Sequence, residues 1–167
     1  MTRDGARDLP EGFVRLVASR RRTTHPDRVA ALLGEGGSPW ADGRVAHPDG
    51  NDLRRFAVDL RLRVGGETAA LTSPGKSAYV DLGWPRRTAG GWQMEISWLA
   101  STAAPLFPVF SGWLTIGPEE LRIDGLYAPP GGTVGFIADR ILFHAAANGT
   151  ARWVLSEIDR AALGAAA

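Results

Sequence analysis

Three stretches of the sequence place an apolar residue at every second position. In RFAVDLRLRVGG, residues 55–66, the charged residues Asp59, Arg61 and Arg63 separate the apolar set Phe56, Val58, Leu60, Leu62 and Val64. Residues 77–84 repeat the pattern with Ala78, Val80, Leu82 and Trp84, and residues 92–100 repeat it with Trp92, Met94, Ile96 and Trp98. Because successive side chains of a strand point to opposite faces, each stretch predicts a strand with one buried face and one wet face.

Further elements flank these strands. Residues 12–24 predict a first strand, and the segment from His25 predicts a short helix with Pro26 at its first position and Gly34 at its end. Residues 34–52 are rich in Gly, Pro, Asp and Asn, and predict a long loop that carries Trp40 and has room for a second short helix. Residues 106–116 and 119–130 predict two more strands of an antiparallel meander, and a long helix follows over about residues 133–163, with Thr133 as its N-cap.

This order predicts an α+β fold: a curved antiparallel sheet with one long C-terminal helix laid across it. Such an arrangement buries the apolar faces of both elements. At 167 residues and 44% hydrophobic composition, the chain is expected to form a single domain over residues 1–167.

Composition excludes several functional classes. The 19 basic and 18 acidic side chains nearly cancel, so no general field attracts nucleic acid or an anionic membrane. The chain has no cysteine, which excludes disulfides, thiolate catalysis and cysteine metal sites. Its three histidines show no metal-ligand spacing, and we expect neither a metal nor a cofactor. The polar start of the sequence and the lack of a long apolar run predict a cytoplasmic protein without a membrane span.

The C-terminal helix carries a row of polar residues, His144, Asn148 and Arg152, at a spacing of four. At 100° per residue, the expected packing face consists of Val134, Ile137, Ala138, Ile141 and Ala145. The polar row drifts from the edge of that face onto it, which would bring hydrogen-bonding groups to one end of a cavity under the helix. The alternative is that the buried face shifts near Gly149 and leaves the row solvated or paired with strand carboxylates.

Two stretches resemble the START-like, or SRPBCC, superfamily, whose members have the helix-grip fold. They are LFPVFSGWLTI at residues 106–116 and LRIDGLYAPPGGTVGFIADRILFHAAANGTARWVLSEI at residues 121–158. The bacterial branch described as polyketide cyclase- or dehydrase-like is the most similar, since its strand end of Gly, Tyr and two prolines precedes a helix with an Asp-Arg pair. Here these residues are Gly125, Tyr127 and Asp139-Arg140, with Leu126 inserted between the glycine and the tyrosine. The resemblance implies a deep, mostly apolar cavity between sheet and helix, and it carries over no catalytic residue.

The sequence therefore predicts binding of a hydrophobic or aromatic small molecule in this cavity. The expected contacts are the aromatic residues Trp84, Trp98 and Tyr127 and the polar residues His144, Asn148 and Arg152. Core packing is the competing explanation for the tryptophans, and a structural role is the competing explanation for His144. Two other functions stay open: an aromatase-, cyclase- or dehydratase-like enzyme acting on a polyketide-like substrate, and a module that contacts a partner protein. A homodimer is also left open.

Overall fold

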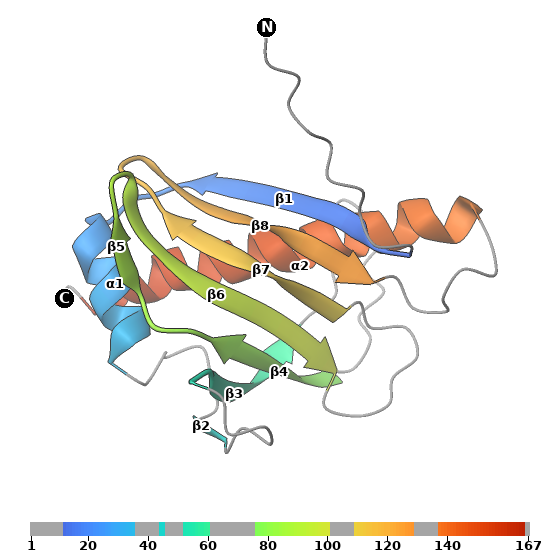
Figure 1. Cartoon of the computed structure of the whole chain (residues 1–167), viewed down its shortest axis with the longest axis horizontal. Helices are drawn as coiled ribbons and strands as arrows, with labels where there is room; N and C mark the ends of the chain where they lie inside the picture. Colours follow the sequence, from blue (N-terminus) through green and yellow to red (C-terminus); the bar gives the residue numbers. More distant parts are fainter. Residues whose placement is uncertain are drawn as a thin grey trace, which may run out of the picture.

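The computed structural model describes residues 12–35, 44–45, 52–60, 76–100, 109–128 and 137–165. Eight strands and two helices follow one another along the chain (Figure 1). The elements are β1 (Val14–Arg21), α1 (Pro26–Gly34), β2 (Arg44–Val45), β3 (Arg54–Leu60), β4 (Lys76–Leu82), β5 (Arg86–Thr88), β6 (Gly91–Ala100), β7 (Val109–Ile116), β8 (Glu120–Ala128) and α2 (Ile137–Gly164).

All strands belong to one antiparallel sheet in the order β1-β8-β7-β6-β4-β3-β2, with β5 paired to β6. Figure 1 shows α2 running along one face of this sheet. The helix packs on β1 and β8, and α1 lies against α2, β6 and β7. The predicted α+β architecture, a curved antiparallel sheet around a C-terminal helix, is therefore confirmed. We call the face toward α2 the inner face and the opposite face the outer face.

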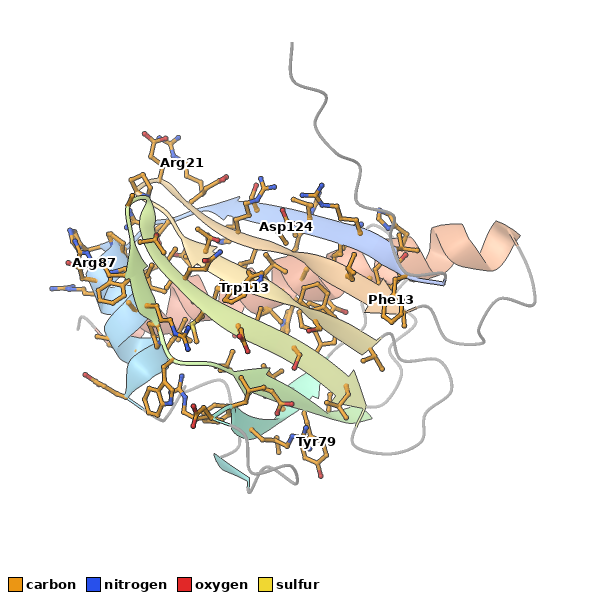
Figure 2. The ribbon with its side chains drawn as sticks, in the orientation of Figure 1. Phe13, Arg21, Tyr79, Arg87, Trp113 and Asp124 are labelled. Carbon is orange, nitrogen blue, oxygen red and sulfur yellow. The ribbon has the colours of Figure 1, made fainter. Side chains whose placement is uncertain are left out.

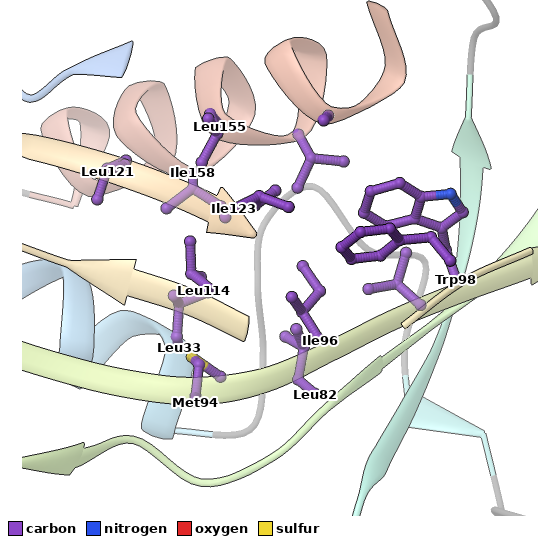
Figure 3. Close-up of a cluster of buried hydrophobic side chains, with 14 of the residues drawn as sticks. Leu33, Leu82, Met94, Ile96, Trp98, Leu114, Leu121, Ile123, Leu155 and Ile158 are labelled. Carbon is purple, nitrogen blue, oxygen red and sulfur yellow. The ribbon is translucent and has the colours of Figure 1, made fainter. Parts of the chain in front are cut away.

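The predicted alternation fixes which residues form the core. The inner-face residues Phe56, Val58, Ala78, Val80, Leu82, Met94, Ile96 and Trp98 are all buried. The predicted positions Leu62 and Val64 lie outside the described residues. Figure 3 shows how the inner-face side chains of β4, β6, β7 and β8 meet those of α2 in one apolar cluster.

Trp84 does not continue this buried row, contrary to the sequence prediction. The strand β4 ends at Leu82, so the alternation stops before Trp84, and this side chain is 49% exposed. The guanidinium of the buried Arg54 lies 4.2 Å from the centre of its indole ring.

Of the packing face predicted for α2, only Ala145 can be compared, because Val134 lies outside the described residues and the side chains of Ile137, Ala138 and Ile141 are not described. Ala145, expected on that face, is exposed. The buried residues of the helix recur at intervals of three and four, and they are Ala147, Thr150, Ala151, Val154, Leu155, Ile158, Asp159 and Ala162. The prediction was anchored on the apolar residues before position 146, whereas the larger apolar side chains after Gly149 point in another direction.

The remaining local predictions concern α1 and the long loop. Helix α1 begins at Pro26 as expected, and the Nδ1 atom of His25 accepts a hydrogen bond from the Asp27 amide at 3.4 Å. The loop predicted over 34–52 contains the two-residue strand β2, and its other residues lie largely outside the described ranges. None of the helices among the described residues has the length and apolarity to cross a membrane.

Candidate functional site

A row of aromatic side chains crosses the inner face of the sheet. The strand register places one residue from each of six neighbouring strands in line, in the order Phe56, Val80, Trp98, Phe110, Tyr127 and Val14. Four of these six are aromatic. Because side chains directly opposite one another on adjacent strands lie about 4.5–5.5 Å apart at Cβ, the three consecutive aromatic residues Trp98, Phe110 and Tyr127 lie side by side, and Val80 separates them from Phe56. We call it the aromatic row.

Trp98 and Phe110 form the centre of the aromatic row. Their ring centres are 4.0 Å apart with an angle of 18° between the ring planes, and neither side chain is exposed. The row beside them contains Gly112 and Gly125, which face each other across β7 and β8. A Cβ atom at either glycine would come within 2.8 Å of the Phe110 ring. The two glycines therefore leave the space that the Phe110 ring occupies.

The indole N–H of Trp98 is buried without an acceptor. Its Nε1 atom has no hydrogen-bond partner among the described residues, although the side chain is inaccessible to solvent. Leaving a buried donor unsatisfied costs about 1–3 kcal/mol, and nearly all buried polar groups in folded proteins avoid that cost. In Figure 3 the indole lies at one end of the buried cluster, beyond Ile96. The inner face thus presents a hydrogen-bond donor in apolar surroundings.

Tyr127 links the aromatic row to α2. Its hydroxyl lies 3.3 Å from the Nδ1 atom of His144, and the two ring centres are 6.0 Å apart. Tyr127 is buried, whereas His144 is exposed. His144 precedes Ala151 by seven residues and Leu155 by eleven, so it lies on the same side of α2 as these buried residues. The Tyr127–His144 pair therefore connects the inner face with solvent.

The other predicted polar residues lie apart from the aromatic row. The side-chain amide of Asn148 donates to the backbone carbonyl of His144 at 3.0 Å, within the helix itself. Arg152 is exposed. Of the six predicted contacts, the structure brings Trp98, Tyr127 and His144 together, with Asn148 one turn of helix away. Trp84 and Arg152 are not part of this group.

Phe110 was missed as a site residue because its importance depends on strand register. The sequence shows an aromatic residue in a predicted strand, but it does not show which residues lie opposite. The pair of glycines is a signal that was available: a glycine in the middle of each of two consecutive strands often marks a place where another group comes close.

The far half of the inner face is filled by packed side chains. Leu114, Leu121 and Ile123 of the sheet join Leu155 and Ile158 of α2 in the buried cluster (Figure 3). Among the described side chains, no group of three or more His, Cys, Asp or Glu residues is placed to hold a metal ion. The end of the inner face that carries Trp98, Tyr127 and His144 is thus the candidate ligand site.

Comparison with known proteins identifies the fold but not the activity. No family model and no curated protein matches the sequence. The crystal structure of Ara h 8.0201 is similar, with a TM-score of 0.51 and 10% identity over 92% of this chain and 99% of that one. A crystal structure of an uncharacterised protein from Bacillus thuringiensis gives a TM-score of 0.49 at 12% identity, covering 90% of this chain and 99% of that one. The likeness to Ara h 8.0201 shows the fold alone, a Bet v 1-like helix-grip fold.

Proposed function

We propose that this chain of helix-grip fold binds a hydrophobic, aromatic small molecule between the aromatic row and α2. The observation that carries the proposal is the buried Trp98 N–H, which has no partner in the part of the chain that the structure describes. A ligand with a hydrogen-bond acceptor at this point would satisfy the donor, and its apolar body would lie on the aromatic row. Apolar pockets with a few placed polar groups are the usual construction of small-molecule sites.

The aromatic rings and polar groups of the site also indicate the shape of the ligand and the positions of its polar groups. The stacked rings of Trp98 and Phe110 favour a flat ring system. At the other end, the Tyr127 hydroxyl and the His144 ring offer a second polar contact that is open to solvent. We therefore expect a flat molecule with one acceptor near Trp98 and a polar group toward His144.

Two probes that differ in one hydroxyl test the proposal. We expect the wild-type protein to bind 2-naphthol more tightly than naphthalene in calorimetric titrations, by about fivefold, because one hydrogen bond contributes about 1 kcal/mol. The Trp98→Phe variant should lose this difference between the probes. The matched variant Trp113→Phe changes the outer face instead and should retain it.

The comparison between probes separates the hydrogen bond from a general loss of packing, because both probes lose the same packing in the Trp98→Phe variant. An equal preference for 2-naphthol in both variants, or no binding by the wild-type protein, would contradict the proposal.

An enzyme with its active site at the same place is a second candidate, and the Tyr127–His144 contact favours it. A hydroxyl within hydrogen-bonding distance of an exposed imidazole is able to pass a proton between a bound substrate and water. An aromatase-, cyclase- or dehydratase-like reaction on a polyketide-like substrate would use such a step. Tyr127→Phe should then abolish turnover of a linear poly-β-ketone substrate while leaving it bound, and Arg152→Ala, on the exposed side of α2, should not. Turnover by the Tyr127→Phe variant at the wild-type rate would exclude this role.

A further inference from the structure

The outer face of the sheet contains a hollow of about 950 Å³, on the side away from α2. Its walls are mainly outward-facing residues of β1, β4, β6, β7 and β8, together with Leu53 and with Ile96, Gly112 and Gly125 of the same strands. Figure 2 views this face, with Trp113 and Asp124 labelled on β7 and β8. The hollow lies on the opposite side of the sheet from the proposed apolar ligand, so it represents a separate site.

The Trp113 indole is the largest apolar side chain that lines this hollow, beside Leu53, Ile96 and Leu126. Trp113 is 42% exposed. The register places Glu95 on one side of it and Asp124 on the other. The neighbouring outward-facing pairs of β6 and β7 are neutral and polar. Gln93 lies opposite Thr115, and Ser97 lies opposite Ser111. A flat apolar ring is thus surrounded by groups that donate and accept hydrogen bonds.

The charges in the hollow largely cancel within the protein. Asp124 accepts two hydrogen bonds from Arg15, at 3.2 and 3.0 Å, and one from Arg122 at 3.0 Å. The hydrogen bond from Arg15, with a further one from Arg122, lowers the pKa of Asp124. Asp81 is held by Arg55 at 2.7 and 2.8 Å. Glu95 is exposed and forms no ion pair with an arginine of the described residues, so its carboxylate oxygens are able to accept hydrogen bonds from a ligand. Because most charged groups of the hollow are already paired, a strongly charged ligand would gain little electrostatic attraction there.

The hollow continues toward a second exposed tryptophan. An adjoining depression of about 340 Å³ shares Leu53, Glu95 and Trp113 with the first and is also lined by Trp84 and Arg86. Among the described residues, Trp84 is the other tryptophan whose side chain is exposed. Two exposed indoles with a free carboxylate between them therefore border one continuous groove on the outer face.

We propose that this groove binds a neutral carbohydrate, with Trp113 as the principal stacking residue. A sugar ring has a flat face of C–H groups that packs on an indole, and a rim of hydroxyls that both donate and accept hydrogen bonds. Gln93, Glu95, Ser97, Ser111 and Thr115 provide matching partners around Trp113. A cationic amine fits less well, because Arg15, Arg86 and Arg122 also line the groove. A lipid chain would leave these polar groups unpaired.

A printed array of neutral, acidic and amino-sugar oligosaccharides, probed with the full chain, tests the proposal. We expect binding to neutral oligosaccharides, which calorimetry with the best of them should place in the micromolar to millimolar range. Trp113→Ala should weaken this binding at least tenfold, and Glu95→Gln should weaken it by a smaller factor. Val109→Ala is the matched control, since Val109 is exposed on the same strand and face but does not line the groove. It should bind like the wild-type protein.

Three outcomes would overturn the proposal. They are no binding to any oligosaccharide, equal binding by the wild-type and Trp113→Ala proteins, and binding confined to sulfated or other anionic glycans, which would reflect Arg15 and Arg122 instead. Because Trp113 is exposed, its removal is expected to leave the fold intact, and a thermal melt of each variant checks this. The test does not depend on the inner-face ligand: Trp98→Phe should leave carbohydrate binding unchanged.

Discussion

Gly112 and Gly125 illustrate how single residues shape the inner face. A Cβ atom at Gly112 would lie 2.5 Å from the Asp124 carbonyl oxygen, and one at Gly125 would lie 2.4 Å from the Ser111 carbonyl oxygen. Both positions also adjoin the Phe110 ring. Because the obstructing atoms belong to the backbone of the neighbouring strand, they cannot move aside without distorting the sheet. The lack of a side chain at these two glycines thus leaves the space in which the Phe110 ring lies beside Trp98.

We expect Gly112→Ala and Gly125→Ala each to lower the free energy of unfolding by about 1–3 kcal/mol, the usual range for overpacking. Gly90→Ala is the control, since nothing lies within 4 Å of a Cβ atom at that position. Urea denaturation of the three variants measures the effect. Equal stability of all three would show that the close packing around Phe110 is not a constraint.

Asp124 predicts a pH dependence of stability. Its hydrogen bonds with Arg15 and Arg122 lower its pKa from the ordinary value of 3.8. A carboxylate with a lowered pKa in the folded state stabilises the protein above the ordinary value, and this contribution is lost as the pH falls through the lowered pKa. Since both arginine side chains are largely exposed, the contribution is about 1 kcal/mol or less.

The wild-type protein should therefore be more stable than Asp124→Asn at pH 6, and the difference should disappear below the lowered pKa. Parallel urea denaturations between pH 6 and pH 2 measure it. A difference that persists unchanged to the lowest pH would show that the carboxylate charge is not its source.

At the scale of elements, a buried carboxylate attaches α2 to the connection between β1 and α1. Asp159 is buried and accepts hydrogen bonds from the Thr23 amide at 3.0 Å and the Thr23 hydroxyl at 2.9 Å. The Nε atom of Arg20 lies 3.6 Å from its second oxygen. This contact fixes the C-terminal half of α2 against the edge of the sheet.

We expect Asp159→Ala to lower the free energy of unfolding by about 1–3 kcal/mol, because it leaves a partly buried amide without an acceptor. Arg160→Ala, one residue further along and exposed, should change it by less than about 0.5 kcal/mol. Thermal or urea denaturation compares the two. A loss of stability no larger in the Asp159 variant than in the Arg160 variant would show that this attachment contributes nothing.

The elements also show how far the sequence alone predicts this fold. The period-two pattern correctly identified the buried faces of β3, β4 and β6, since burial on one face is what produces the pattern. The prediction that Trp84 belongs to the buried row of β4 was wrong, because the pattern does not show where a strand ends. The helical pattern was wrong at Ala145 of α2, because small alanines on several sides of the helix give its packing face no clear direction.

The candidate site was predicted less completely than the fold. Trp98 and Tyr127 were identified because both lie in clear strands, and His144 because it was the one histidine in a long helix. Their combination with Phe110 depends on which strands are neighbours and in what register, and that information comes from long-range pairing. The groove around Trp113 was not predicted at all, because polar residues on a wet face give no pattern of their own.

In the whole molecule, the two faces of one sheet suit two kinds of ligand, which are those of the two proposals above. The inner face offers stacked aromatic rings and one buried donor, and it suits a flat apolar molecule. The outer face offers an exposed indole among polar groups, and it suits a neutral sugar. The central claim is that the apolar ligand binds beside Trp98 on the inner face.

Nitrogen-15 NMR of the six indole N–H groups, assigned with single Trp→Phe variants, tests this claim most directly. During titration with 2-naphthol, we expect the Trp98 resonance to shift with increasing probe, because its N–H gains an acceptor, while the Trp113 resonance stays in place. A shift of the Trp113 resonance with the Trp98 resonance unmoved would contradict the account, and so would a titration in which no indole resonance moves.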